Sequence, residues 1–232
     1  MKVCFYGDSI GRGVVLDNVK KRYGYSENSF ARLLEGEGIV TVNNRCKFGC
    51  TSTKGLEVMR AEADRMKNYD YIVIMYGGND SDYDWPAVAR DPEHGAQYVK
   101  TSVPVYKQNI RDMVDLVHAS GSTPVLLSMI PMDPARYFNW ITRKSDPDAI
   151  LKYIKAPSGL YFGNQLYNLA LFDVAAELSV PLIDICSPFL RELDFSDYLC
   201  EDGIHPSEAG HMLIYEEVKA FLQEHQLLQN EE

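Results

Sequence analysis

The sequence KVCFYGDSI at residues 2–10 joins a short run of β-branched and aromatic side chains to a Gly-Asp-Ser turn. A run of this kind without polar alternation predicts a strand that is buried on both faces, as in a parallel sheet. Gly7 favours a sharp turn directly after that strand. The sequence therefore places Ser9 at the carboxyl end of a buried first strand, which is the edge where open α/β sheets bind their ligands.

Four further runs of the same kind follow along the chain, at residues 40–43, 71–75, 125–129 and 182–185. Segments with helical periodicity separate them, so strand and helix alternate through the chain. This alternation predicts an α/β fold, with right-handed crossovers that make all five strands parallel. We expect a flavodoxin-like three-layer sandwich with a five-stranded parallel sheet in the order 2-1-3-4-5.

The helical segments carry apolar side chains at the spacing of one helix face, and we interpret each stripe as core packing. The four stripes are Leu56, Met59, Ala63 and Met66; Ile110, Val114 and Val117; Leu166, Leu169, Ala170 and Val174; and Ile214, Val218, Phe221 and Leu222.

Composition limits the class of protein. The chain has 232 residues, of which 46% are hydrophobic and 24% charged, which predicts a single domain over residues 1–232. A net charge of −10 argues against nucleic acid or an anionic membrane surface as the main partner, because both would be repelled. The sequence thus favours a small molecule as the partner. It leaves the oligomeric state open.

The first strand begins so early that it leaves no room for a signal peptide. No stretch reaches the roughly 18 apolar residues of a membrane span. If Met1 is the native start, we expect no membrane insertion and a cytoplasmic location. The five cysteines are scattered and odd in number, which argues against a disulfide framework. Cys46 and Cys50 lack a nearby second pair of ligands, so we expect small buried side chains and no metal.

Three more motifs lie in loops that follow the predicted strands. Gly49 follows the second strand, Gly77-Gly78-Asn79-Asp80 follows the third, and Asp202-Gly203-Ile204-His205-Pro206 lies between the fifth strand and the last helix. In the order 2-1-3 the loops after the first three strands are neighbours, so Ser9, Gly49 and Asn79 should face one pocket. A serine, donors for an oxyanion, a histidine and a carboxylate form a complete set for acyl transfer through a serine ester.

This set of motifs resembles the SGNH hydrolase superfamily, also called GDSL-type esterases and lipases, and the resemblance covers the whole chain. It implies that Ser9 is the nucleophile, His205 the base and Asp202 the acid that orients the base. It also implies an oxyanion hole formed by the backbone N–H groups of Ser9 and Gly49 and the side-chain amide of Asn79. Two departures occur: Ile10 stands where leucine is commoner, and the sequence around Gly49 matches the family only loosely.

Other interpretations of these residues are open. Ser9 could cap a helix, the Gly-Gly-Asn-Asp segment could be an ordinary loop, and His205 could be a structural histidine. Residues 7–11 also match the Gly-x-Ser-x-Gly elbow of α/β-hydrolases, but those enzymes place several strands before the serine and separate the acid from the histidine. A noncatalytic binding module with a phosphate at a helix after Gly13 is a further alternative.

The segment 132–161 is long for a loop and rich in aromatic and basic side chains. It is either a lid or pocket wall after the fourth strand, or a solvated helix with a few core aromatics. We expect an esterase that needs no cofactor and acts on small esters, with short acyl chains or acetylated carbohydrates favoured. The local positive charge leaves a lysophospholipid or a coenzyme A thioester as the alternative.

Overall fold

A computed structural model of the protein describes residues 1–17, 19–38 and 40–229. Its centre is a parallel sheet of five strands in the order β4-β1-β5-β6-β7. In chain order of the five predicted strands this is 2-1-3-4-5, and the predicted fold class is confirmed. The strands are β1 (Lys2–Gly7), β4 (Thr41–Asn44), β5 (Tyr71–Met75), β6 (Thr123–Leu127) and β7 (Leu182–Ile183).

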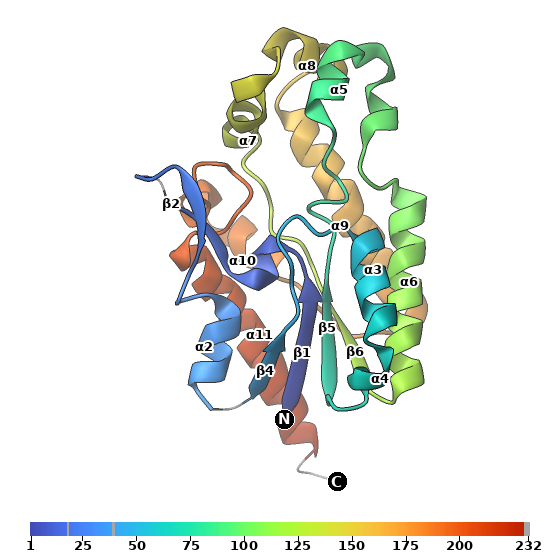
Figure 1. Ribbon diagram of the computed structural model, residues 1–232. Helices are drawn as coiled ribbons and strands as arrows, with labels where there is room; N and C mark the ends of the chain where they lie inside the picture. Colours follow the sequence, from blue (N-terminus) through green and yellow to red (C-terminus); the bar gives the residue numbers. More distant parts are fainter. Residues whose placement is uncertain (18, 39, 230–232) are drawn as a thin grey trace.

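Helices cover both faces of the sheet (Figure 1). On one face lie α3 (Ser52–Ala61), α4 (Ala63–Met66), α6 (Val103–Ser120) and α9 (Ser158–Leu178); on the other lie α2 (Phe30–Gly36), α10 (Cys186–Arg191) and α11 (Glu208–Gln229). Alternate residues of each strand serve the two layers. In β1, for example, Cys4 and Tyr6 pack in the first layer, whereas Val3 and Phe5 pack in the second. This two-sided burial explains why β1, β5 and β6 show no polar alternation. The prediction of two-sided burial is wrong for the edge strand β4, where Thr41 and Asn43 are exposed.

A group of helices forms a cap above the carboxyl ends of the strands (Figure 1). Side chains of the cap form a third core cluster. The elements of the cap are α5 (Trp85–Arg90), the 3₁₀ helix η1 (Pro92–Tyr98), α7 (Pro134–Ile141), the 3₁₀ helix η2 (Thr142–Lys144) and α8 (Pro147–Ile154), together with the first turn of α9. Each of the helices α5, α7 and α8 has a proline within its first two residues and an aspartate immediately before the helix. The aspartate accepts backbone N–H bonds from the first turn, and together the two residues fix where the helix begins. The segment 132–161 is thus mostly helical.

An antiparallel hairpin between the first strand and α2 was not expected from the sequence. After the short helix α1 (Ser9–Arg12) the chain turns at Gly13, whose φ of +82° favours glycine, and enters β2 (Val14–Asp17) and β3 (Arg22–Tyr25). The proposal of a phosphate-binding helix after Gly13 is therefore wrong, because a strand starts there. A remaining 3₁₀ helix, η3 (Phe195–Tyr198), precedes the Asp202 loop.

Most predicted core stripes are confirmed, but the stripe on α9 is partly wrong. Leu166 and Leu169 are 58% and 62% exposed, whereas Tyr167, Leu171 and Val174 are buried. The helix is apolar on nearly every side, so periodicity alone could not tell which face meets the sheet. No helix within the described residues is long and apolar enough to cross a membrane.

Candidate active site

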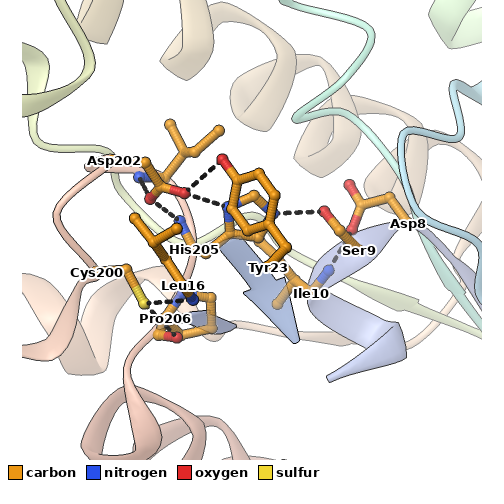
Figure 2. A network of polar contacts seen from close by, with 10 residues as sticks. Asp8, Ser9, Ile10, Leu16, Tyr23, Cys200, Asp202, His205 and Pro206 are labelled. Atoms are coloured by element: carbon orange, nitrogen blue, oxygen red, sulfur yellow. Dashed lines mark hydrogen bonds and ion pairs between the residues drawn. The ribbon is translucent and has the colours of Figure 1, made fainter. Parts of the chain in front are cut away.

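Three side chains form a hydrogen-bonded series at the carboxyl edge of the sheet (Figure 2). The hydroxyl oxygen of Ser9 lies 2.9 Å from Nε2 of His205, and Nδ1 of His205 lies 2.7 Å from Oδ2 of Asp202. All three residues are at least nine-tenths buried. The structure therefore joins, in the predicted order, residues that are 196 positions apart in the sequence.

Ser9 owes its position to the turn that follows β1. The Asp8 carboxylate accepts a hydrogen bond from the backbone N–H of Ile10 at 3.0 Å and so caps α1. Gly7 has no room for a side chain, because a Cβ there would lie 2.7 Å from the carbonyl oxygen of Met75. The close approach of β1 to β5 thus requires the glycine, and Ser9 follows at the first residue of α1.

The Asp202 loop is organised by the carboxylate that it contains. Oδ1 of Asp202 accepts the backbone N–H groups of Ile204 and His205, both at 3.1 Å, while Oδ2 accepts the His205 ring. Burial acts to raise the pKa of Asp202, but the bonds from His205 and Ile204 hold it below its ordinary value. Asp202 is thus ionised at neutral pH. At Gly203, φ is +75° and a Cβ would lie 2.6 Å from the carbonyl oxygen of Asp133.

The predicted oxyanion donors line the same cavity as Ser9 and His205. Asn79 follows Gly77, where a φ of +139° and a Cβ position 2.2 Å from Sδ of Met129 both demand glycine. The side-chain amide of Asn79 donates to Oδ2 of Asp8 at 3.3 Å. Because an amide nitrogen carries two hydrogens, the second one is available to a ligand.

Gly49 is exposed, and its φ of +68° places it in a left-handed turn before α3. The N-terminus of α3 is fixed by Asp80, whose two carboxylate oxygens accept the backbone N–H of Ser52 at 3.0 and 2.9 Å. Asp80 directly follows Asn79. The loop after β5 is therefore bonded to the loop after β1 through Asn79 and to the loop after β4 through Asp80. Gly49 thus lies at the wall of the cavity that Ser9 and Asn79 also line, and its role as an oxyanion donor stays a prediction.

The charge of Asp8 is sensitive to pH near neutrality. Burial raises the pKa of Asp8 to about 6, although the bond from Ile10 and the proximity of His205 oppose the shift. This carboxyl therefore changes its charge directly beside Ser9 and Asn79.

A cavity of about 520 Å³ opens at Ser9 and extends beneath the cap. Its volume lies in the range of small-molecule sites, about 300–1,000 Å³. Most of its wall is apolar or aromatic; the lining side chains from the cap are Tyr83, Trp85, Met132, Tyr137, Tyr153, Ile154 and Leu160. The segment 132–161 contributes five of these seven residues.

Aromatic residues surround His205, and sequence reasoning missed their role. The Tyr23 ring of the β2–β3 hairpin lies 4.9 Å from the His205 ring, and the Phe48 ring stacks on His205 at 6.1 Å with an interplanar angle of 9°. Trp140 of α7 lies 5.9 Å from Tyr23 and carries the guanidinium of Arg143 at 3.8 Å above its ring. Only the Gly-rich turn at Gly13 hinted at this hairpin in the sequence.

All five cysteines are free and buried. Burial raises the pKa of the Cys46 and Cys50 thiols, as expected for small core side chains. Within the described part of the chain, no group of three or more His, Cys, Asp and Glu side chains is arranged to hold a metal ion.

The fold and the site thus define a three-layer α/β protein with a Ser–His–Asp series beside a ligand-sized cavity. A model of the GDSL-like lipase/acylhydrolase family matches residues 5–213. The chain belongs to this family and is an ester-hydrolysing enzyme. The comparison with curated proteins found no match.

Solved structures with the same fold cover nearly the whole chain. A lipase/acylhydrolase from Enterococcus faecalis is 21% identical, with a TM-score of 0.63 over 96% of this chain and 94% of its own. An alpha/beta hydrolase enzyme from the metagenome of Lake Arreo is 19% identical, with a TM-score of 0.66 over 96% and 94%. An acetylxylan esterase from Geobacillus stearothermophilus is 18% identical, with a TM-score of 0.64 over 95% and 93%. At these identities the likeness establishes the fold.

Proposed function

We propose that this protein is a serine hydrolase that cleaves small carboxylic esters through an acyl-enzyme. The observation that carries the proposal is the unbroken series from Ser9 through His205 to Asp202, with distances of 2.9 and 2.7 Å, at the wall of the cavity. A serine hydroxyl is a weak nucleophile at neutral pH and needs an adjacent base. Nε2 of His205 lies within hydrogen-bond reach of that proton.

In the first half-reaction the Ser9 oxygen attacks the ester carbonyl carbon, and its proton moves to Nε2 of His205. The carbonyl oxygen gains the negative charge, which the N–H groups of Ser9 and Gly49 and the Asn79 amide stabilise. The C–O bond to the alcohol then breaks, and His205 returns the proton to the leaving oxygen. Asp202 holds the ring in the required tautomer and stabilises the imidazolium.

In the second half-reaction a water molecule gives a proton to His205 and attacks the acyl-enzyme. The bond to Ser9 breaks, the carboxylic acid leaves, and Ser9 recovers its proton. Every proton transfer in this scheme passes through one ring nitrogen. The backbone donors and Asn79 are already held by the turn at Gly49 and by Asp8, so little reorganisation is needed as charge develops.

The substrate that we propose is an ester with a short acyl chain. The apolar wall beneath the cap suits the acyl group, and the volume of about 520 Å³ admits chains longer than acetyl. The leaving alcohol must lie within reach of Nε2 of His205 to receive its proton. Phe48, which is 53% exposed, and Tyr23 flank that side of the site.

The exposed ring of Phe48 at the wall of the cavity favours one particular class of alcohol. A flat ring of this kind can pack against the face of a sugar, and this arrangement supports acetylated carbohydrates as the second candidate. A lysophospholipid or a coenzyme A thioester carries phosphate groups, so it would need a cation near the entrance of the cavity. Arg143, whose guanidinium lies above the Trp140 ring, is the candidate for that cation.

An activity panel tests these assignments. The panel contains p-nitrophenyl esters from acetate to dodecanoate, acetyl xylan, a lysophospholipid and an acyl coenzyme A. We expect turnover of the acetate to hexanoate esters. Absence of hydrolysis across the whole panel would contradict the proposed function, whereas a preference for the lysophospholipid or the thioester would correct the substrate class alone.

A further inference from the structure

The β2–β3 hairpin is fastened to the loop that carries Asp202 and His205 (Figure 2). The backbone N–H of Leu16 donates to Sγ of Cys200 at 3.4 Å, and the Cys200 thiol donates to the carbonyl oxygen of Pro206, also at 3.4 Å. At the tip of the hairpin Lys21 forms an ion pair with Glu201. The contacts of Leu16 with Cys200 and of Lys21 with Glu201 join residues 184 and 180 positions apart in the sequence, so the hairpin and the loop form one unit.

Tyr23 projects from this hairpin onto the Asp–His pair. Its hydroxyl donates to Oδ2 of Asp202 at 2.9 Å, and the same oxygen accepts Nδ1 of His205 at 2.7 Å. Burial raises the pKa of Tyr23 above its ordinary value of 10, and the charge of Asp202 raises it further. The hydroxyl therefore keeps its proton and remains a donor across the working pH range.

We propose that Tyr23 is a positioning residue of this esterase, which acts through Asp202 and sets the pH at which His205 becomes available as a base. The inference rests on the proposed function. It goes beyond that function because neither the Ser–His–Asp series nor the oxyanion donors require a tyrosine.

The direction of the effect follows from the shared oxygen. Two donors divide the negative charge of Oδ2, which weakens its attraction for the proton on His205. Without the Tyr23 hydroxyl, Oδ2 would act on the imidazolium alone and hold its proton to higher pH. As the pH is lowered, kcat/KM of an enzyme without this hydroxyl would therefore begin to fall at a higher pH than kcat/KM of wild type.

Other charged or titratable groups around the pair stay in place when this hydroxyl is removed. Asp8 from the turn after β1 and His211 from α11 act on His205, while Cys200 faces Asp202 and Arg143 faces Tyr23. Farther out, Arg136 and Glu201 act on Cys200. A shift between Tyr23→Phe and wild type therefore reports the hydroxyl and not these groups.

Tyr23→Phe and Tyr25→Phe form a matched pair for the test. Both remove one hydroxyl from β3, but Tyr25 is 61% exposed and its ring lies beneath Arg12, away from Asp202. Tyr23→Phe keeps the ring that packs on His205, Phe48 and Trp140. We expect its acid limb of kcat/KM on p-nitrophenyl acetate to move up by roughly 0.5–1 pH unit, because the Tyr23 bond to Asp202 persists in both protonation states of His205 and only part of its energy contributes to the shift.

At the plateau we expect kcat of Tyr23→Phe to fall less than tenfold, with little change in KM, and Tyr25→Phe to match wild type throughout. A second readout does not depend on turnover: the ring resonances of His205 are followed by NMR against pH and assigned by their loss in His205→Gln. Their titration midpoint should rise in Tyr23→Phe by the same amount as the acid limb.

Each outcome decides the question. Equal midpoints in wild type and Tyr23→Phe would overturn the proposal, as would a uniform loss of activity at every pH, because the hydroxyl would then have only a structural role. If wild type hydrolyses no ester, the proposed function fails, while the NMR titration still tests the effect of Tyr23 on His205.

Discussion

Nδ2 of Asn79 lies 3.3 Å from Oδ2 of Asp8, the residue directly before Ser9. This hydrogen bond connects the loops after β5 and β1, and it orients the amide next to the candidate nucleophile. The amide's remaining hydrogen can then serve an oxyanion. The bond explains how two loops that are 71 residues apart in the sequence come to line one cavity.

Removal of this amide should act on the chemical step. We expect Asn79→Ala to lower kcat by roughly 10²–10³, with a smaller change in KM, because the hydrogen bond strengthens as charge develops on the carbonyl oxygen. Steady-state kinetics on p-nitrophenyl acetate provide the measurement. Asn43→Ala, on the exposed edge strand β4, is the control. An Asn79→Ala enzyme with most of its kcat would show that Asn79 only shapes the turn.

The nucleophile can be identified by covalent labelling. A fluorophosphonate should modify Ser9 alone, and Ser9→Ala should abolish both labelling and turnover while leaving the unfolding temperature close to that of wild type. Peptide mass spectrometry locates the label. Modification of Ser52 or another serine would reassign the nucleophile.

The depth of the cavity should limit the length of the acyl chain. Gly163 on α9 lines the cavity, and a Cβ placed there meets no heavy atom within 4 Å. Gly163→Leu should therefore fold, yet reduce kcat/KM for hexanoate more than tenfold while changing acetate little. Gly36→Leu on α2, where a Cβ also meets open space, is the matched control. An unchanged chain-length profile would mean that the acyl group lies elsewhere.

Much of this architecture could be predicted from local sequence. The buried runs of β1 and β5 and the glycines that follow them are signals within a few residues, and a parallel sheet necessarily brings their ends together. Asp202 and His205 lie in one short loop, so their pairing could also be predicted from the sequence. The strand order then placed Ser9 and Asn79 on one edge.

The hairpin and its tyrosine could not be predicted in this way. β2 and β3 are four residues each, and the contact of Leu16 with Cys200 spans 184 positions. Short strands of this kind depend on tertiary contacts rather than on their own propensity. The exposed face of α9 was missed for the opposite reason, since too many of its residues are apolar for periodicity to choose a side.

His211 should make the protein sensitive to acid. Its ring is buried against Phe30, and burial lowers its pKa from 6.5 to about 4. Because the folded pKa is depressed, the unfolded chain binds a proton first as the pH falls below 6.5. Stability is therefore lost between pH 6.5 and about 4. Asp8, with its raised pKa of about 6, acts in the opposite direction over part of this range.

Thermal unfolding of His211→Phe and wild type across this range isolates the contribution of the histidine, since Asp8 is present in both. We expect the unfolding temperature of the variant to fall less on acidification, by several degrees, given about 2–4 °C per kcal/mol for a domain of this size. His118→Gln, on the exposed surface of α6, should behave as wild type. Parallel curves for wild type and His211→Phe would contradict the prediction.

The last prediction concerns the dependence of activity on Asp202 and pH. Histidines ordinarily gain a proton near pH ~6.5, and a protonated ring cannot accept the proton of Ser9. The lowered pKa of Asp202 keeps its carboxylate charged below that pH, so the acid limb of kcat/KM should reflect the imidazole and not Asp202. Asp202→Asn should lower kcat by about 10³–10⁴, because the ring loses the acceptor that fixes its tautomer.

Full profiles of wild type, Asp202→Asn and the exposed control Asp197→Asn on one ester, between pH 4 and 9, provide the comparison. Only Asp202→Asn should be slow, and KM should change far less than kcat, because Asp202 lies behind His205 and does not contact the substrate. Activity that stays level down to pH 4, or an Asp202→Asn enzyme that equals wild type at every pH, would show that the base is not His205 held by Asp202. The hydrogen bond between these two side chains would then stabilise the loop and have no role in the reaction.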